Sequence, residues 1–307
     1  MPSQSAEKTE NWKLRALLGF FSHDSDPADW SFRAVRNPPA RSLCTDSIGR
    51  RHSLDLASLI SDQEKTPWQR FEHHIRQLNA EDPAQKRYKV FFVMRHGEGL
   101  HNVKEAEVGR EAWERTWARK SGDDHSIWED AELTLKGEQQ AKDAASFWED
   151  AIRTAKVPLP ELFISSPLRR CLRTLELTFS SLVPSLGKPF KPRIDEQLRE
   201  RCGVHTCDKR STRSWIASAY PTFTIPDGFA EDDQLWTASK REQLEEHVTR
   251  TEELLGEIFQ NEDAMFVSLT AHSGVLMALF KATGYKMIPV AAGTIYPLFV
   301  KAEKSSI

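Results

Sequence analysis

The feature that most constrains the fold of this chain is the alternation of short apolar runs with helical stripes after residue 88. Residues 88–94 (YKVFFVM) and 265–271 (MFVSLTA) are apolar runs that fit buried strands. Between them, apolar residues recur at three- and four-residue steps, which predicts helices over about 133–155, 168–182 and 244–259. Strands separated by helices indicate a mostly parallel sheet covered on both faces. We therefore expect an α/β fold, a three-layer α/β/α sandwich.

One stretch interrupts this rhythm. Residues 185–240 contain four prolines and end near an acidic patch at 231–233. We interpret them as an inserted cap within a single α/β domain over 88–307. Further short strands are expected at 162–165 and 295–300, and a helix at 274–283.

Residues 1–87 differ from the rest, because their aromatic residues are scattered among prolines and charges. One helix stands out there. Thr66 can cap it and Pro67 suits its first turn. Apolar residues then follow at helical spacing (Trp68, Phe71, Ile75 and Leu78). We expect an N-terminal extension over 1–87 that packs on the core domain.

Composition excludes several classes of protein. The net charge of −3 gives no support for nucleic-acid binding. No apolar stretch is long enough to cross a bilayer, so no membrane partner is expected. The four cysteines form no disulfide framework, and the polar start lacks the features of a secretory signal, which together favour a cytoplasmic location. Neither a P-loop nor a dinucleotide fingerprint occurs, and no cofactor is expected.

Two histidines follow the predicted buried strands directly. His96 comes after 88–94 and His272 after 265–271, each with a glycine within two residues. In open α/β sheets the sites lie beyond the carboxyl ends of the strands. The segment 165–170 (SSPLRR) repeats this design and adds arginines, whose planar fork suits a phosphoryl group. Histidines and arginines gathered at strand ends predict a positive cup for a phosphoryl group.

These segments resemble the motifs of one family. VMRHGEGLHN resembles the signature of the histidine phosphatase (phosphoglycerate mutase-like) superfamily, and residues 133–141, SSPLRRCLRT, Leu198-Arg199-Glu200 and TAHSG are similar to its other segments in the same order. Residues 203–208 (GVHTCD) resemble its fungal and plant branch.

The resemblance implies roles for individual residues. His96 would be the nucleophile that becomes phosphohistidine. Glu200 would donate a proton to the leaving group. The phosphoryl oxygens would be held by the remaining site residues: Arg95, Arg170 and His272, which are also catalytic, together with Asn102 and Ser273.

Several points stay open from sequence. Glu196 or Asp195 could be the proton donor instead of Glu200. His101 and His205 are ambiguous, and Gly99 stands where the family commonly has serine or threonine. The following are expected at the surface or in structural roles: His73, His74, His125, His247, Arg169 and Arg173. The aromatic residues of the cap either line a pocket or pack among themselves: Trp215, Tyr220, Phe223, Phe229 and Trp236.

Cys202, His205 and Cys207 have none of the usual zinc spacings, so no metal site is expected. The expected activity is that of a metal-independent phosphohydrolase whose partner is a small phosphorylated metabolite. A phosphoglycerate-type mutase is the alternative, as is a non-phosphatase enzyme or a binding protein that reuses the fold. The substrate is not assigned, and candidates range from sugar phosphates to prenyl diphosphates.

Overall fold

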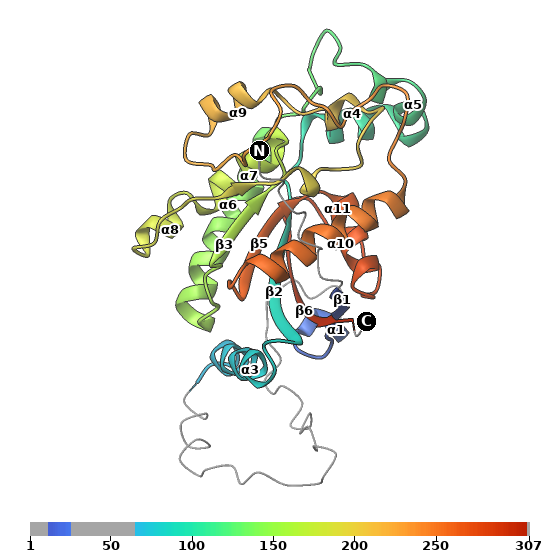
Figure 1. The fold of residues 1–307 in the computed structure, drawn as a ribbon. Helices are drawn as coiled ribbons and strands as arrows, with labels where there is room; N and C mark the ends of the chain where they lie inside the picture. Colours follow the sequence, from blue (N-terminus) through green and yellow to red (C-terminus); the bar gives the residue numbers. More distant parts are fainter. Residues whose placement is uncertain (1–11, 26–64, 306–307) are drawn as a thin grey trace, which may run out of the picture.

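A six-stranded sheet forms the middle of the molecule in the computed structural model, which describes residues 12–25 and 65–305 (Figure 1). The strand order is β1-β6-β2-β5-β3-β4. Strands β2, β5, β3 and β4 run parallel, whereas β6 pairs antiparallel with both β2 and β1. The sheet is therefore mostly parallel, as predicted. The strands are β1 Trp12–Ala16, β2 Lys86–Arg95, β3 Leu162–Ser165, β4 Arg193–Ile194, β5 Phe266–Ala271 and β6 Ile295–Lys304.

Helices cover both faces of this sheet. The longer ones among the described residues are α3 Pro67–Glu81, α6 Leu135–Asp150, α7 Arg169–Phe179, α10 Leu244–Asn261 and α11 Ser273–Ala282. The shorter ones are α1 Ser22–Ser25, α4 Leu100–Val108, α5 Arg110–Arg115, α8 Leu182–Ser185 and α9 Arg213–Ala219, with the 3-10 turns η1 Trp117–Arg119, η3 Glu196–Leu198 and η4 Thr206–Asp208 and the π-turn η2 Ala151–Ala155.

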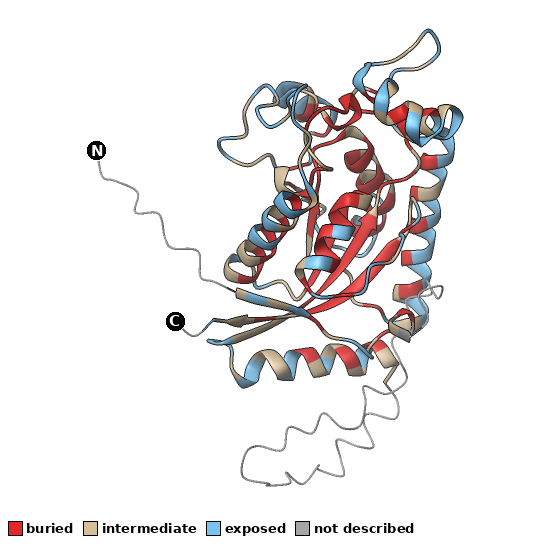
Figure 2. Ribbon diagram, turned by 90° about the vertical axis from the view of Figure 1, so that its right-hand side faces the viewer, coloured by how far each residue is buried: buried red, intermediate tan, exposed pale blue. Residues whose placement is uncertain are grey.

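Strand β2 shows why three layers form. Val90, Phe92 and Met94 belong to one buried cluster, together with residues of α3, α6 and α7. Phe91 and Val93 alternate with them and belong to a second cluster, with residues of α10 and α11. A strand with apolar side chains on both faces must be covered on both sides. The buried residues accordingly run through the middle of the molecule (Figure 2), and the predicted three-layer sandwich is confirmed.

The N-terminal residues contribute to this core. Strand β1 pairs with β6 from Trp12 opposite Lys304 to Ala16 opposite Val300. Helix α3 begins at Pro67 after Thr66, whose side chain accepts from the backbone of Gln69. Residues 1–11 and 26–64 of the expected extension lie outside the described residues.

The loops that follow the parallel strands form a cap at one end of the sheet (Figure 1). One part runs from α4 through η1, and the other from η3 through α9. The segment 185–240, expected to be an inserted cap, is not all cap. It also contains β4, which pairs with β3 in the sheet. Among the described residues, no helix combines the length and apolar character needed to cross a membrane.

Candidate active site

His96 lies directly after β2, where the parallel strands end. Its backbone N–H donates to the carbonyl of Ala271 at 3.0 Å, so the end of β5 holds it in place. The residue is 3% exposed, and Nδ1 lies 2.7 Å from the carbonyl oxygen of Gly97. A carbonyl only accepts, so Nδ1 carries the ring proton and Nε2 keeps its lone pair. Burial, and then the charge of Arg170, hold the pKa of His96 well below its ordinary value, so the ring is neutral.

Arg170 lies between two histidine rings. Its Nε is 3.3 Å from Nε2 of His96 and 3.3 Å from Nδ1 of His272. The other guanidinium nitrogens are fixed by the cap, because Nη1 donates to the carbonyl of Cys207 at 2.5 Å and Nη2 to Asp208 Oδ1 at 2.8 Å. Arg170 is 1% exposed. The guanidinium is thus fixed beside the imidazole expected to react.

His272 follows β5 and is fully buried. Its ring centroid is 5.1 Å from that of His96, and Nε2 lies 2.8 Å from the hydroxyl of Ser166. Burial, followed by the charge of Arg170, lowers the pKa of His272 well below its ordinary value. Both histidines are therefore neutral.

The loop after His96 is held by the start of α6. The side chain of Thr134 caps this helix and also donates to Glu98 Oε1 at 3.0 Å. A Cβ on Gly97 would lie 2.3 Å from the carbonyl oxygen of Gly137. Glycine at these two positions lets the two backbones touch, which explains the spacing of the segment 133–141.

Glu200 places its carboxylate at the start of α11. Oε2 accepts from the N–H of Gly274 at 3.0 Å and from the hydroxyl of Ser273 at 3.4 Å, and Oε1 accepts from the N–H of Arg201 at 2.9 Å. A Cβ at position 274 would lie 1.9 Å from Oε1, so glycine leaves room for this carboxylate.

The two other acids considered from sequence lie elsewhere. Glu196 forms an ion pair with Arg210, and Asp195 accepts from the N–H of Gln197 at 2.9 Å. Neither lines the cavity described below, whereas Glu200 does.

Arg95 and Asn102 complete the residues expected to hold a phosphoryl group. Arg95 Nη1 donates to the carbonyl of Val290 at 2.7 Å, and its buried Nε has no hydrogen-bond partner among the described residues. Asn102 Oδ1 accepts from the N–H of Gly99 at 3.0 Å, so its NH₂ group is left for another acceptor.

These residues border a cavity of about 450 Å³. Of the seven site residues predicted from sequence, six line it; His272 does not, but its Nδ1 lies 3.3 Å from Nε of Arg170, which does. The lining is strongly charged, with five arginines and four carboxylates. Six of these charged residues were not predicted from sequence: Glu105, Arg110, Glu114, Arg201, Asp208 and Arg241.

Asp208 is the main residue that sequence reasoning missed. It is 2% exposed and holds Arg170 through Oδ1 and Arg241 through Oδ2, the latter at 2.7 Å. Burial alone would raise the pKa of Asp208, but the charges of Arg241 and Arg170 outweigh this and lower it. The available signal was the run 203–208 (GVHTCD), which resembles the fungal and plant branch and ends at Asp208.

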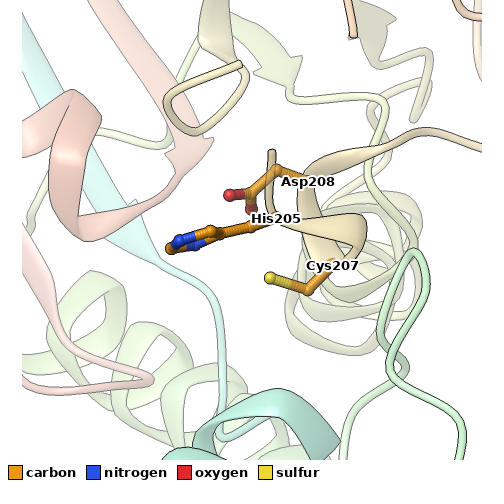
Figure 3. Close-up of side chains that lie close together, drawn as sticks. All are labelled: His205, Cys207 and Asp208. Atoms are coloured by element: carbon orange, nitrogen blue, oxygen red, sulfur yellow. The ribbon is translucent and has the colours of Figure 1, made fainter. Parts of the chain in front are cut away.

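His205, Cys207 and Asp208 lie close enough to suggest a metal site (Figure 3), since one ligand atom from each falls within 4.8 Å of the others. Their surroundings do not suit a cation. Asp208 is already paired with two arginines, and His205 Nε2 lies 2.9 Å from Glu114 Oε2. We therefore interpret the group as part of the support for Arg170.

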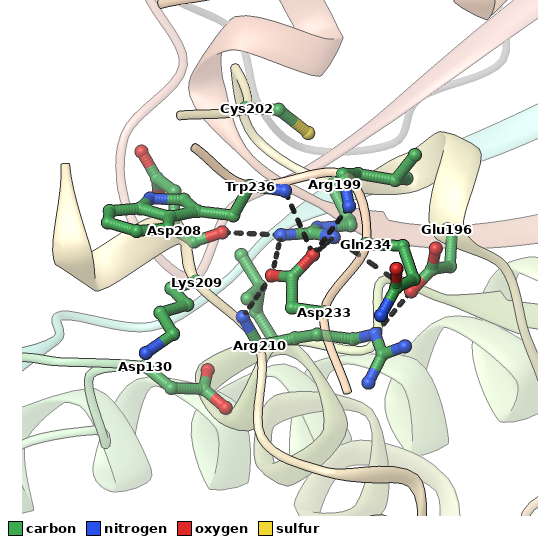
Figure 4. Close-up of polar contacts among 12 residues, drawn as sticks. Asp130, Glu196, Arg199, Cys202, Asp208, Lys209, Arg210, Asp233, Gln234 and Trp236 are labelled. Atoms are coloured by element: carbon green, nitrogen blue, oxygen red, sulfur yellow. Dashed lines mark hydrogen bonds and ion pairs between the residues drawn. The ribbon is translucent and has the colours of Figure 1, made fainter. Parts of the chain in front are cut away.

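Figure 4 shows the contacts that fix the segment carrying Glu200. Arg199 is fully buried and forms hydrogen bonds from Nη1 to Asp233 Oδ1 at 2.8 Å and from Nη2 to the carbonyl of Asp208 at 2.7 Å. The N–H of Arg210 donates to Asp233 Oδ2 at 2.9 Å. These contacts join residues 196–210 to residues 230–236. They thereby fix the backbone around Glu200 and Asp208, which both line the cavity.

Other expectations can be compared with the structure. His247 was expected at the surface but is fully buried under the cap, where α10 packs on α11 and η3. His205 lines the cavity, and His73 and His125 are exposed. Arg169 and Arg173 stay outside the cavity and form ion pairs with carboxylates, as expected for structural residues.

The five aromatic residues expected within or at the edge of the segment 185–240 do not line the cavity. Tyr220 and Phe223 are buried in the core cluster beside α7, and Trp215 and Phe229 pack against it. Trp236 donates from its indole N–H to the carbonyl of His205 at 2.8 Å. Of the two alternatives left open, packing is the one observed.

Comparison with known proteins agrees with the order of these motifs. The model of the histidine phosphatase superfamily (branch 1) matches residues 91–289. A "probable phosphoglycerate mutase" of Arthroderma benhamiae is 41% identical over 249 residues, which cover 81% of this chain and 74% of that protein. "Phosphoglycerate mutase-like protein 1" of Arabidopsis thaliana is 27% identical over 243 residues, which cover 72% of this chain and 81% of that protein.

Among solved structures, the alpha-ribazole phosphatase from Shigella flexneri covers 70% of this chain and 94% of that chain, with 17% identity and a TM-score of 0.41. The family match spans more than half of the chain, and the predicted resemblance to fungal and plant members is confirmed. The chain belongs to the histidine phosphatase superfamily.

Proposed function

We propose that this protein is a metal-independent phosphohydrolase that acts on a small phosphorylated metabolite through a phosphohistidine at His96. The observation that carries the proposal is the state of the His96 ring. Its Nδ1 donates a hydrogen bond to the carbonyl of Gly97, so the ring is neutral and its unprotonated nitrogen, Nε2, lies beside Arg170 at the cavity. A neutral imidazole nitrogen that carries no proton can attack phosphorus, and the covalent intermediate divides one difficult step into two.

The first step transfers the phosphoryl group to the enzyme. Nε2 of His96 forms a bond to phosphorus as the bond to the leaving oxygen breaks, and Glu200 gives its proton to that oxygen. Arg95 and Arg170 stabilise the charge on the phosphoryl oxygens. Asn102 and Ser273 supply further hydrogen bonds to them, whereas His272 lies outside the cavity lining and acts through its contact with Arg170.

The second step regenerates the enzyme. The carboxylate of Glu200 takes a proton from a water molecule, whose oxygen attacks phosphorus as the N–P bond breaks. Inorganic phosphate leaves and His96 returns to its neutral form.

The cavity wall also bears on the substrate. It is lined by charged groups of both signs, whereas its large apolar side chains are Trp113, Leu244 and Met277. A long apolar chain would leave these charges desolvated and unpaired, which costs free energy. We infer a polar phosphomonoester, such as a sugar phosphate, in preference to a prenyl diphosphate.

A phosphoglycerate-type mutase is the second candidate, because the relative at 41% identity is named "probable phosphoglycerate mutase" and the one at 27% "phosphoglycerate mutase-like protein 1". A mutase returns the phosphoryl group from His96 to the substrate, whereas a hydrolase gives it to water. Release of inorganic phosphate therefore separates the two. A binding protein, the third alternative, would form no phosphohistidine.

The test combines product analysis with trapping of the intermediate. A panel of sugar phosphates, phosphoglycerates and prenyl diphosphates is assayed for phosphate release, and wild type is quenched in alkaline denaturant after mixing with ³²P-labelled substrate. We expect release from the polar monoesters, an acid-labile label on His96, and neither in His96→Ala. The exposed His73→Ala is the matched control and keeps full activity. Isomerised product without phosphate release would favour the mutase, and an active His96→Ala would refute the mechanism.

A further inference from the structure

His101 is a third histidine beside the expected phosphoryl position. It is the second residue of α4, is 8% exposed and lines the same cavity as His96. The two ring centroids are 5.6 Å apart, close to the 5.1 Å between His96 and His272. His101 therefore lies about as near to the nucleophile as His272 does.

The ring of His101 differs from its neighbours in having no hydrogen-bond partner among the described residues. Nδ1 is buried without one. By contrast His96 contacts Gly97, His272 contacts Ser166 and His205 contacts Glu114. Buried polar atoms are nearly always paired, and an unpaired one is destabilising. A ring left unpaired at a cavity wall is suited to a ligand.

Gly99 provides the space for this ring. A Cβ at position 99 would lie 2.7 Å from Nδ1 and 2.8 Å from Cε1 of His101. The backbone of Gly99, with φ −102° and ψ 161°, is one that any residue adopts, so its conformation does not require glycine. The absence of a side chain at 99 is explained by the imidazole that lies against it.

The contacts also indicate which nitrogen of His101 carries the proton. Nδ1 is enclosed against Gly99 with no acceptor in reach, and a buried N–H without an acceptor is rarer than a lone pair without a donor. We therefore place the proton on Nε2, which, unlike Nδ1, is not among the buried side-chain atoms without a partner. Burial, and then the charges of Arg170 and Arg95, lower the pKa of His101 well below its ordinary value, so the ring is neutral.

We propose that His101 recognises the phosphoryl group, donating a hydrogen bond from Nε2 to one of its non-bridging oxygens. The two histidines then have complementary tautomers: His96 presents a lone pair to phosphorus, and His101 presents an N–H to oxygen. The inference rests on the proposed phosphoryl chemistry and adds His101 to the residues that bind the phosphoryl group. Gly99 is the residue that positions the His101 ring.

The test measures binding apart from turnover, with inorganic phosphate and orthovanadate as probes in calorimetric titrations. His101→Leu has similar bulk but no donor. His101→Gln places an amide N–H near the position of Nε2. A hydrogen bond to a charged group contributes about 1.5–3 kcal/mol, so His101→Leu should weaken phosphate binding by roughly 10- to 100-fold. His101→Gln should recover much of the loss, and the exposed His125→Leu should bind as wild type does.

A double-mutant cycle tests the link with Gly99. Gly99→Ala forces the ring of His101 to move and should weaken phosphate binding in wild type. It should have little effect in a His101→Ala background, where no ring is displaced. Melting temperatures of all variants show whether any loss comes from unfolding.

The outcomes separate this inference from the proposed function. If His101→Leu binds phosphate as tightly as wild type while His96→Ala is inactive, His101 has no such role and the phosphohydrolase proposal stands. Equal losses in His101→Leu and His101→Gln, with equal falls in melting temperature, would also refute it in favour of a packing role. If wild type binds neither probe, both proposals fail.

Discussion

The carboxylate of Asp208 and the guanidinium of Arg170 form an ion pair of 2.8 Å in which neither side chain is more than 3% exposed. A buried pair of this kind is weak evidence of stability, because desolvation opposes the attraction. Its geometry suggests a positioning role instead. With Nη2 held by Asp208, the Nε of Arg170 points to both His96 and His272.

The first prediction concerns this pair. Asp208→Asn keeps a hydrogen-bond acceptor but removes the charge that orients Arg170. Loss of a charge-assisted hydrogen bond costs about 1.5–3 kcal/mol, so kcat/KM should fall by roughly 10- to 100-fold. Asp208→Ala should in addition lower stability by about 3–5 kcal/mol, because it leaves buried guanidinium groups unpaired.

Urea unfolding and steady-state kinetics with an aryl phosphate measure these two effects. The exposed Asp150→Asn is the control for loss of a surface charge. If Asp208→Asn keeps full kcat/KM, Arg170 does not depend on Asp208 for its orientation.

The second prediction concerns Glu200 and the leaving group. An alkoxide is a poor leaving group that needs a proton in the transition state, whereas a nitrophenolate does not. Glu200→Gln keeps the size of the side chain but cannot donate a proton in the same way. It should slow alkyl phosphates by roughly 10²- to 10⁴-fold and slow nitrophenyl phosphate much less.

Glu196→Gln and Asp195→Asn are the matched comparisons, since both acids lie near in sequence but outside the cavity. Neither variant should show a dependence on the leaving group. If one of them does and Glu200→Gln does not, that residue is the proton donor.

The third prediction is that activity survives removal of metal ions. Arg95 and Arg170 already supply positive charge at the expected phosphoryl position, and Asp208 is taken up by two arginines. Hydrolysis of an aryl phosphate should proceed at the same rate after dialysis against EDTA. Loss of activity that a single divalent ion restores would contradict the mechanism.

Local patterns were enough to predict most of the fold. The apolar run that forms β2 is buried on both faces, and such a run requires helices on both sides of the sheet. Thr66 and Pro67 marked the start of α3 because caps are local interactions. The sequence also placed His96 and Arg170 at one sheet edge, since parallel strands end together.

The remaining parts of the site depend on contacts between distant segments. Asp208 meets Arg170 across 38 residues, and nothing local to either residue reveals the pair. His247 was misplaced because its burial depends on how α10 packs under the cap, and helical spacing alone does not show that. The role inferred for Gly99 depends on a side-chain approach that only the folded chain reveals.

The last prediction follows from four buried neutral histidines. Burial is the main cause that lowers the pKa of each of them: His96, His101, His247 and His272. Histidine in the unfolded chain takes up a proton near pH 6.5, whereas these rings in the folded protein resist it. Below that pH the unfolded state binds more protons, so the free energy of unfolding must fall as the pH falls.

Each such proton contributes a slope of about 1.4 kcal/mol per pH unit, so four together approach about 5 kcal/mol per unit. The loss should begin near pH 6.5, and for His247 it should continue toward its folded pKa of about 4. Urea unfolding in phosphate-free buffers from pH 7.5 to 5.5 measures the slope. His247→Leu should reduce it by about one proton, because neither ring nitrogen of His247 has a hydrogen-bond partner among the described residues. The exposed His125→Leu should leave the slope unchanged, and a flat profile in wild type would show that these rings are protonated in the folded protein.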